Sequence, residues 1–545
     1  MSDLQQPPGM NENSLRSDFD AIIVGAGFAG LYMLYKLRGM GFSTRVFEAG
    51  SGVGGTWYWN RYPGARCDVE SMQYSYQFSE ELQQEWEWTE KYSPQPEILR
   101  YVNHVADRFD LRRDIQFDTR VETAIFDETA GKWMIETSDG TRVSARFCIM
   151  ATGCLSSHNQ PNFKGLDTFA GAWYHTGQWP HEGVDFSGQR VGVIGTGSSA
   201  IQAIPIIAEQ ATHLTVFQRT PNYTIPAHNA PLEPEAVKAV KADYAGLRQR
   251  AKQTPPGLAL PFNAAKALET SQEERQREYE ARWDHGGIAF IGAFSDLMLD
   301  SEANDTAAEF VRAKIRETVQ DPEVAELLSP RNVIGCKRLC VDTDYYATFN
   351  RPNVTLVDIS EAPIEEITPT GLKANSTAYE LDAIVFAIGF DAMTGALLKI
   401  DIRGRDEQTL NEKWLGGPRT YLGLATSGFP NLFTITGPGS PSVLTNMLPS
   451  IEQHVEWIAD CLDYMREHRH GCIEPTIEAE DNWVSHVNEI ADVSLRSTCS
   501  SWYVGANVPG KPRVFMPYIG GFPVYVKKCE QVAANGYEGF ALAPV

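Results

Sequence analysis

Residues 20–30 read Asp20-Ala-Ile-Ile-Val-Gly25-Ala-Gly27-Phe-Ala-Gly30, an apolar run that ends in three closely spaced glycines. The periodic apolar segment from Leu31 to Leu37 predicts a helix, and Thr44–Phe47 predicts a second strand that ends at Glu48. A strand, glycine turn, helix, strand and acid in this order indicate a Rossmann-type dinucleotide-binding unit. The glycines let a pyrophosphate approach the helix N-terminus, and the Glu48 carboxylate accepts hydrogen bonds from a ribose. A dinucleotide is therefore expected here.

The same unit recurs later in the chain. A strand at Arg190–Ile194 leads into the turn Gly195-Thr-Gly197-Ser-Ser-Ala200, followed by a helix at Ile201–Glu209 and a strand at Leu214–Phe217. The spacing from Gly195 to residue 218 equals the spacing from the first glycine of the earlier turn to its acid. The sequence therefore predicts two dinucleotide-binding units in one α/β chain.

The residues expected to bind the ribose differ between the two units. Gln218 stands where the first unit has its acid, and Arg219 and Thr220 follow it. A carboxylate repels the 2′-phosphate of NADPH, whereas a guanidinium and a hydroxyl bind it. The first unit is thus expected to bind FAD or NAD, and the second NADPH.

Composition excludes several classes of function. The chain has 545 residues, 43% of them hydrophobic, which is enough for two or three domains. A net charge of −23 argues against nucleic acid or an anionic membrane as a partner. No apolar run is long enough for a membrane span. The first twenty residues are polar and lack the apolar core of a signal peptide, so they predict a loose arm. Nine scattered cysteines without metal-like spacing favour free thiols in the cytoplasm and no metal site.

Two longer motifs carry a family resemblance. Phe169-Ala-Gly171-Ala-Trp-Tyr-His175-Thr-Gly-Gln-Trp179-Pro180 matches the pattern F-x-G-x-x-x-H-x-x-x-W-P at every fixed place. Gly54-Gly55-Thr-Trp57-Tyr-Trp-Asn-Arg-Tyr62-Pro63-Gly64-Ala-Arg-Cys-Asp68 matches a second pattern. Through these motifs, and nearly end to end, the chain resembles the Baeyer–Villiger monooxygenases among the class B flavin monooxygenases, in particular the phenylacetone and cyclohexanone groups.

The resemblance implies an α/β fold with two Rossmann-like domains, one for FAD and one for NADPH, and a helical insertion. Two apolar strands that end in glycine, at Phe147–Gly153 and Ala383–Gly389, are expected where the chain crosses between domains. Helical periods at Glu235–Arg250, Gln272–Trp283 and Thr306–Val319 predict the insertion. The expected division is an FAD-binding domain from 1–152 and 389–545, an NADPH-binding domain from 153–228 and 331–388, and a helical subdomain at 229–330.

The resemblance also implies the reaction. Tightly bound FAD, NADPH and molecular oxygen would convert a ketone to an ester or lactone through a flavin peroxide. Both the peroxide and its ketone adduct are negative, so a fixed cation beside the flavin is the main requirement. The resemblance places Arg338 there, in Gly335-Cys-Lys-Arg338, with Asp68 orienting it. Guanidinium suits this role because it stays protonated when partly buried.

Other roles follow from the same resemblance. Lys337 would join Arg219 and Thr220 around the 2′-phosphate, and if it lies in a strand its side chain points away from that of Arg338. Trp502 would donate its ring N–H to the nicotinamide cofactor. The residues expected to bind the cofactors are Gly25, Gly27, Ala29, Gly30, Glu48, Thr56, Trp57, Trp59, Asp68, Tyr74, Val121, Met447, Gly195, Thr196, Gly197, Ser198, Ser199, Ala200, Gln202, Arg219, Thr220, Lys337 and Trp502.

The resemblance implies a mostly apolar substrate pocket, as a ketone of low water solubility requires. His175 is not assigned as a general base, because the resemblance puts it at a domain connection, where it would relay cofactor binding into domain movement. Cys67 and Cys154 are expected near the flavin without a partner cysteine, which argues against a disulfide mechanism. The predicted pocket residues are Cys154, Leu155, Ser442, Val443, Leu444 and Met447.

Three alternatives remain open at this stage. An N-hydroxylating or S-oxidising flavin monooxygenase would share the fold and cofactors, but Pro180 and Arg338 in their motifs favour ketone chemistry. A pyridine-nucleotide disulfide reductase would need paired cysteines. An FAD-binding regulator without redox activity would need no NADPH site, against which Arg219, Thr220 and Lys337 argue. The expected protein is a cytoplasmic monomer or weak homo-oligomer.

Overall fold

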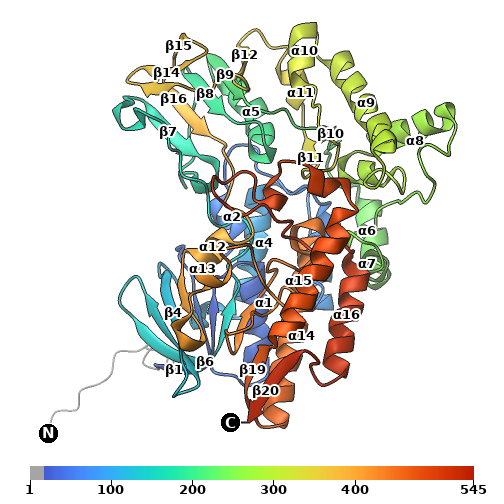
Figure 1. The fold of residues 1–545 in the computed structure, drawn as a ribbon. Coiled ribbons are helices and arrows are strands. Elements are labelled where there is room, and N and C mark those ends of the chain that lie inside the picture. Colours follow the sequence, from blue (N-terminus) through green and yellow to red (C-terminus); the bar gives the residue numbers. More distant parts are fainter. Residues whose placement is uncertain (1–16, 545) are drawn as a thin grey trace.

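The computed structural model describes residues 17–544 and contains two large sheets, one above the other in Figure 1. Most of the predicted N-terminal arm, residues 1–16, lies outside the described residues. The predicted α/β class with two dinucleotide-binding units is confirmed. No helix in residues 17–544 has both the length and the apolar character that crossing a bilayer requires.

The first sheet has eight strands in the order β17-β4-β5-β6-β1-β2-β3, with β18 also paired to β6. Strand β1 runs parallel to both β2 and β6, as a dinucleotide-binding unit requires. Helices α1 and α14 pack together, and their apolar residues form one core cluster with those of α4. The strands are β1 (Asp18–Val24), β2 (Thr44–Phe47), β3 (Ile115–Gln116), β4 (Val121–Asp127), β5 (Lys132–Thr137), β6 (Arg142–Met150), β17 (Asp401–Arg403) and β18 (Leu432–Thr434).

The second sheet has five parallel strands in the order β12-β9-β8-β16-β7. Helix α5 follows β8 and packs with it, so this sheet repeats the βαβ geometry of the first. Its strands are β7 (Ala172–His175), β8 (Arg190–Ile194), β9 (His213–Gln218), β12 (Val354–Asp358) and β16 (Ala383–Phe386), with α5 at Ser198–Gln210.

The chain passes between the two sheets twice. It leaves the first sheet after β6 and enters the second at β7, and it returns from β16 to β17. Gly153 and Gly389 lie just beyond the ends of β6 and β16 with φ of 73° and 77°, a left-handed conformation that glycine adopts without strain. The predicted glycine-ended strands therefore lie at the crossings. Segments from both halves of the chain build the first sheet.

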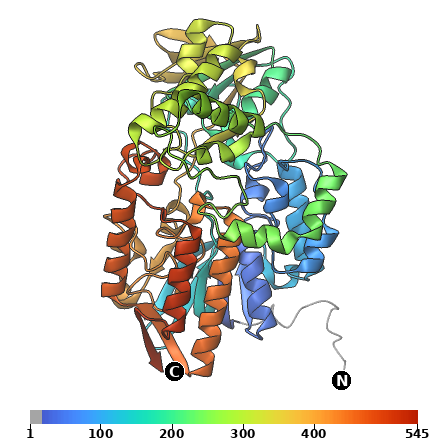
Figure 2. The same ribbon diagram turned by 90° about the vertical axis from the view of Figure 1, so that its right-hand side faces the viewer.

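Helices α6 to α10 lie between β10 (Thr224–Pro226) and β11 (Cys340–Asp342), which pair with each other. Figures 1 and 2 show α6 and α7, in green, beside the N-terminal part of the chain. The predicted helix Glu235–Arg250 is wrong in one respect, because it is broken at Asp243, whose side chain caps α7 by accepting from Gly246 N–H. The five helices are α6 (Pro234–Ala242), α7 (Tyr244–Lys252), α8 (Gln272–His285), α9 (Ser301–Thr318) and α10 (Pro322–Leu328).

The remaining elements join or cover these parts. A three-stranded antiparallel sheet β13-β14-β15 extends the second sheet's side of the molecule, and β19 pairs with β20 near the C-terminus. The remaining helices are α1 (Phe28–Gly39), α2 (Thr56–Trp59), α3 (Glu80–Glu85), α4 (Gln95–Arg108), α11 (Tyr345–Thr348), α12 (Gly395–Leu398), α13 (Leu410–Lys413), α14 (Met447–Glu467), α15 (Ile477–Asp492) and α16 (Phe522–Ala534), and the remaining strands β13 (Glu366–Thr368), β14 (Gly371–Ala374), β15 (Thr377–Glu380), β19 (His470–Pro475) and β20 (Phe540–Pro544).

Candidate active site

The first glycine turn approaches neighbouring backbone too closely for any side chain. A Cβ on Gly25, whose φ is 105°, would lie 2.6 Å from the carbonyl oxygen of Ala151. A Cβ on Gly30 would lie 1.8 Å from the carbonyl oxygen of Gly25. Gly27 is the N-cap of α1 and has no side chain to satisfy the first N–H groups of that helix. These N–H groups are therefore free to bind a phosphate, as the first unit of the sequence predicts.

Glu48 follows β2 and is only 5% exposed. Its Oε2 accepts a hydrogen bond from Ala26 N–H at 2.7 Å, and its Oε1 accepts one from Gly50 N–H at 2.7 Å. Burial raises the pKa of this carboxyl, while the two N–H donors oppose the rise. Each carboxylate oxygen can accept a second bond, so the residue fits a ribose diol beside the turn.

The other residues predicted for the first cofactor lie on several elements. Gly55 N-caps α2 and its Cα would lie 3.4 Å from a Cβ on Gly27, so the two glycine motifs meet. Trp57 in α2 donates its ring N–H to the Tyr74 hydroxyl at 3.0 Å. Thr56 and Trp59 lie at the two ends of α2, Ala29 lies in the first turn of α1, Val121 begins β4 and Met447 begins α14.

The second glycine turn has the same backbone and more space. Gly195 has φ of 109°, and a Cβ there would lie 2.5 Å from the carbonyl oxygen of Ala387. A Cβ on Gly197 would meet no atom within 4 Å. Gly197 N-caps α5 and has no side chain to satisfy the first N–H groups of this helix. The polar side chains of this turn already have hydrogen-bond partners. Thr196 donates to the Thr220 carbonyl, Ser199 pairs with the Thr176 hydroxyl, and Ser198 pairs with the Cys340 thiol. Gln202 accepts from Tyr62 and donates to the Arg66 carbonyl, and Ala200 is buried.

Two cations come together beyond this turn. Arg219 and Thr220 are exposed at the end of β9, whereas Gln218 points away and donates to the Leu327 carbonyl at 2.7 Å. Burial and then the charge of Arg219 lower the pKa of Lys337. Neither cation forms an ion pair within residues 17–544. Two adjacent cations without a carboxylate fit a dianion such as a 2′-phosphate.

Lys337 and Arg338 do not lie in a strand. The expectation that they alternate along one is wrong, because β11 begins only at Cys340 and the two residues belong to the loop before it. Gly335 in that loop has φ of 84°, so the chain turns sharply just before the pair. The two side chains still have different neighbours. The Lys337 side chain is near Arg219, and the Arg338 side chain contacts Asp68.

Arg338 forms a two-pronged ion pair with Asp68. Its Nε donates to Asp68 Oδ2 at 2.6 Å and its Nη2 to Oδ1 at 2.8 Å, while Nη1 donates to the Val443 carbonyl at 2.8 Å. Burial lowers the pKa of Arg338, but the Asp68 carboxylate more than offsets it, so the net pKa is raised. Burial likewise raises the pKa of Asp68, and the Arg338 charge lowers it overall. Both groups are therefore ionised at neutral pH, and the cation is fixed.

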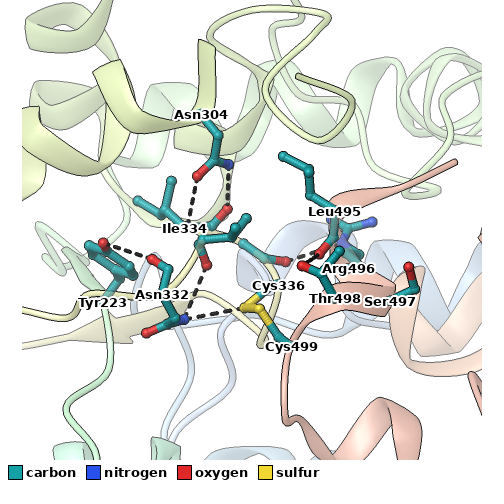
Figure 3. The surroundings of a disulfide bond; sticks show 12 residues. Tyr223, Asn304, Asn332, Ile334, Cys336, Leu495, Arg496, Ser497, Thr498 and Cys499 are labelled. Carbon is teal, nitrogen blue, oxygen red and sulfur yellow. Dashed lines mark hydrogen bonds between the residues drawn. A yellow bond between two sulfur atoms is a disulfide. The ribbon is translucent and has the colours of Figure 1, made fainter. Parts of the chain in front are cut away.

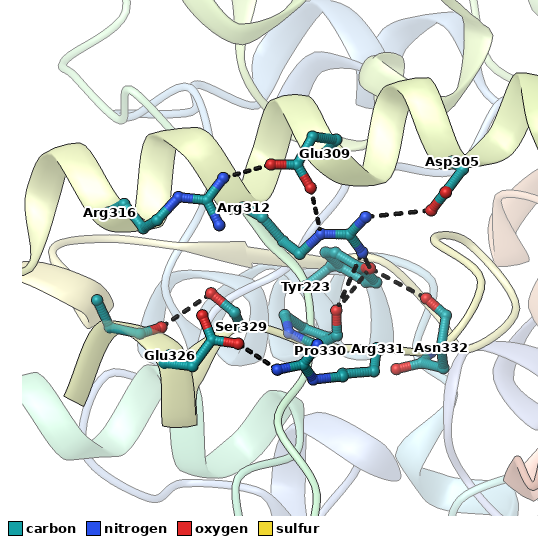
Figure 4. Close-up of polar contacts among 11 residues, drawn as sticks. Tyr223, Asp305, Glu309, Arg312, Arg316, Glu326, Ser329, Pro330, Arg331 and Asn332 are labelled. Atoms are coloured by element: carbon teal, nitrogen blue, oxygen red, sulfur yellow. Dashed lines mark hydrogen bonds and ion pairs between the residues drawn. The ribbon is translucent and has the colours of Figure 1, made fainter. Parts of the chain in front are cut away.

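The helical insertion anchors the segment that leads to Arg338. The Tyr223 hydroxyl donates to the Pro330 carbonyl at 2.9 Å and receives a hydrogen bond from Arg312 of α9 (Figure 4). Asn304, also on α9, donates from Nδ2 to the Ile334 carbonyl and accepts from Ile334 N–H (Figure 3). No sequence motif pointed to these contacts, because they join residues far apart in the chain.

The predicted substrate residues gather in one apolar cluster. Cys154 and Val443 are buried in it with Tyr503 and Phe515, and Leu155, Leu444, Met447 and Trp502 pack against it. Ser442 lies within hydrogen-bond distance of Cys154, with Oγ and Sγ 3.0 Å apart. Because Val443 also accepts from Arg338, this cluster borders the fixed cation. No bond from the Trp502 ring N–H is found within residues 17–544.

His175 is buried at the end of β7 and is neutral at physiological pH. Burial and the nearby His158 lower its pKa to about 4. Its Nδ1 accepts from Gly177 N–H at 2.9 Å, which favours a structural role near the crossing between the sheets. Burial also raises the pKa of the Cys67 and Cys154 thiols, so neither is a reactive thiolate.

The expectation that all nine cysteines are free thiols is wrong. Cys336 and Cys499 form a disulfide, with Cα atoms 6.0 Å apart and a separation of 163 positions along the chain. The other seven cysteines are free. Spacing gave no signal for this pair, because the two residues meet only when the chain folds. Arg496, close to Cys499 and missed by the motifs, donates from Nε to the Gly335 carbonyl at 3.1 Å.

Comparison with known proteins gives the family. Residues 22–245 match the family described as pyridine nucleotide-disulphide oxidoreductase. A Baeyer–Villiger monooxygenase of Pseudooceanicola batsensis is 44% identical over 531 residues, which is 97% of both chains. An acetone monooxygenase (methyl acetate-forming) of Gordonia sp. is 42% identical over 96% of this chain and 99% of its own.

The chain belongs to the Baeyer–Villiger monooxygenases. A solved structure of an oxidised steroid monooxygenase bound to NADP agrees with this, at 53% identity and a TM-score of 0.93 over 97% of this chain and 100% of the other. The predicted class of enzyme, an FAD-containing and NADPH-dependent monooxygenase, is confirmed by membership in this family. The division of the chain at residues 152, 228, 330 and 388 and the roles of the individual site residues stay predictions.

Proposed function

We propose that this Baeyer–Villiger monooxygenase converts apolar ketones to esters or lactones, with Arg338 as the catalytic cation. The observation that carries the proposal is the fixed ion pair of Arg338 with Asp68 beside the apolar cluster that contains Val443. A preorganised positive charge stabilises negative charge that develops on reacting oxygen atoms. The surrounding apolar side chains suit a ketone and exclude water.

Each part of the site has a distinct task in this proposal. The bound flavin supplies the chemistry that takes electrons from NADPH and activates oxygen. The turn around Gly27 and the Glu48 carboxylate hold the FAD pyrophosphate and ribose, while Asp68 keeps Arg338 charged and aimed. The turn around Gly197 holds the NADPH pyrophosphate. Arg219, Thr220 and Lys337 bind its 2′-phosphate, and Trp502 donates its free ring N–H to the nicotinamide cofactor.

The domain division and the surroundings of the protein belong to the same proposal. Residues 1–152 and 389–545 would bind FAD, 153–228 and 331–388 NADPH, and 229–330 would wall the substrate cavity. We further propose a cytoplasmic monomer or weak homo-oligomer, in which seven free thiols suit a reducing compartment. Nitrogen or sulfur oxidation is the alternative, and the motif residues Pro180 and Arg338 favour ketones.

One assay tests the proposed reaction. The purified yellow protein should oxidise NADPH in air faster when a ketone is present, and the product should be the ester or lactone with one added oxygen. Linear, cyclic and aryl ketones, an amine and a sulfide should be compared side by side. Oxygenation of the amine or sulfide without any ester from the ketones would contradict the proposal.

The nucleotide preference should follow Arg219. Arg219→Ala should weaken NADPH binding by about 1–3 kcal/mol, the range for a charged hydrogen bond. NADH lacks the 2′-phosphate and should be little affected. KM values for both nucleotides measure the effect, and Arg316→Ala, an exposed arginine on α9, serves as the control. Equal losses with NADH and NADPH would show that Arg219 does not read the phosphate.

A further inference from the structure

The Cys336–Cys499 disulfide joins the two segments that carry the proposed cation and cofactor residues. Cys336 directly precedes Lys337 and Arg338, and Cys499 lies three positions before Trp502. Figure 3 shows the bond between the loop before β11 and the C-terminal loop after α15. This is the sole disulfide among residues 17–544, a range that contains all nine cysteines.

The C-terminal segment next to the bond donates two hydrogen bonds to neighbouring segments. Leu495 N–H donates to the Met298 carbonyl at 2.9 Å, and Arg496 Nε donates to the Gly335 carbonyl at 3.1 Å. Burial lowers the pKa of Arg496, and the charge of Arg338 adds to this effect. The Asp68 carboxylate pairs with Arg338. The disulfide adds a covalent link between two segments that are otherwise joined by hydrogen bonds such as that from Arg496 to Gly335.

The bond is built so that one sulfur can be attacked and the other can leave. Cys499 is partly exposed, whereas Cys336 is fully buried. The Asn332 side-chain amide donates to Cys336 Sγ at 3.2 Å (Figure 3). This donor stabilises a thiolate on Cys336, and a better leaving thiolate speeds exchange. Attack by an outside thiol is therefore directed to the Sγ atom of Cys499.

We propose that Cys336 and Cys499 form a reversible redox site that responds to a dithiol reductant and to hydrogen peroxide. In the disulfide form, the bond holds Lys337, Arg338 and Trp502 in register around the cofactor and the ketone. In the reduced form, the covalent link is lost and only hydrogen bonds such as that from Arg496 to Gly335 join the segments, so NADPH binds more weakly and fewer electrons reach the ketone. The inference rests on the proposed function and adds to it a control of the same site.

Reduction and re-formation of the Cys336–Cys499 disulfide each conserve atoms and electrons. One thiolate of the reductant attacks Cys499 Sγ, the Cys336–Cys499 bond breaks, and Cys336 leaves as a thiolate. The second thiolate of the reductant then attacks the mixed disulfide and releases Cys499, so two electrons enter the protein and the reductant becomes a disulfide. Both protein thiolates take protons from the solvent. Hydrogen peroxide reverses the change, because two thiols and one peroxide give one disulfide and two waters.

Thiol counting and kinetics on the intact holoenzyme test the proposal. The denatured protein should show seven free thiols before treatment with dithiothreitol and nine after it. After removal of dithiothreitol, the KM for NADPH should rise about 2- to 30-fold. The yield of ester per NADPH should fall, and brief treatment with hydrogen peroxide should restore both values.

Two variants identify the responsible pair. The double variant Cys336→Ser/Cys499→Ser should match the reduced wild type and ignore dithiothreitol. Cys472→Ser, which removes a partly exposed free thiol on β19, should respond as the wild type does. Nine thiols before reduction, equal KM and yield in both wild-type forms, or a response that persists in the double variant would each overturn the proposal. A change in Tm alone would overturn it too.

These outcomes are separate from a failure of the proposed function. If the oxidised wild type makes no ester at all, the ketone reaction is refuted. The thiol count and the KM for NADPH consumption in air remain readable in that case, so they still decide whether the bond controls the cofactor site.

Discussion

Arg338→Ala should consume NADPH and make almost no ester. The variant should fold, hold FAD and be reduced by NADPH, because the side chain of Arg338 contacts Asp68 and Val443 rather than either glycine turn. It loses the charge that stabilises the reacting oxygen atoms, and loss of one such electrostatic contact costs about 10²–10³ in rate. The electrons should leave as hydrogen peroxide. NADPH, peroxide and ester should be measured together in one assay.

Two further variants sharpen this test. Arg338→Lys keeps a charge but cannot bind Asp68 through two parallel bonds, so it should restore oxygenation only in part. Arg403→Ala removes an arginine whose partner is Asp401 on the same strand, β17, and should leave the ester yield unchanged. An alanine variant at position 338 with near wild-type ester per NADPH would refute the catalytic role.

Gly27→Val and Gly197→Val should remove different cofactors. A Cβ on Gly27 would contact Gly55 Cα at 3.4 Å, so we expect the two methyl groups of valine to fill the space proposed for the FAD pyrophosphate. This variant should be colourless or unfolded. A Cβ on Gly197 meets no atom within 4 Å, so that variant should fold and stay yellow. Its valine should block the NADPH pyrophosphate and abolish flavin reduction by NADPH.

Absorbance of the bound flavin and anaerobic reduction measure both effects. Dithionite should still reduce the flavin in Gly197→Val, which separates loss of NADPH binding from loss of redox activity. Gly39→Val places the same side chain at the exposed far end of α1, where a Cβ meets nothing, and should behave as the wild type. The assignment of FAD to the first turn and NADPH to the second would be reversed by the opposite result. In that case Gly197→Val would lose its flavin, and the flavin of Gly27→Val would still be reduced by NADPH.

Local signals in the sequence predicted the two dinucleotide units well. The strands β2 and β8 have the predicted bounds, because each occupies a fixed place in the strand, glycine turn, helix and strand order of a dinucleotide-binding unit. The helix predicted at Glu235–Arg250 is broken, because apolar periodicity does not register a cap such as that of Asp243. The Gly246 N–H donates a hydrogen bond to the Asp243 side chain, which caps the start of α7 just after α6 ends.

Contacts between distant segments could not be predicted in the same way. The loop that carries Lys337 and Arg338 is shaped by Asn304 and Gly335 rather than by strand pairing. The family motifs nonetheless predicted the contact of Arg338 with Asp68. A motif shared within a family carries information on contacts between distant residues, which apolar periodicity does not. The Cys336–Cys499 bond had neither a motif nor a local spacing to indicate it.

The first sheet also sets an order of events during synthesis on the ribosome. The C-terminal residues of β6, Cys148–Met150, pair with β18, which emerges only after residue 431. The strands of the second sheet, from β7 to β16, all lie between those two partners in the chain, with the helices α6 to α10 inserted among them. The nascent chain can therefore complete the second sheet before the first. Until β17 and β18 emerge, the strands β1 to β6 lack part of their pairing. We expect chaperones to bind the nascent chain mainly at the apolar surface of β1 to β6 during this interval.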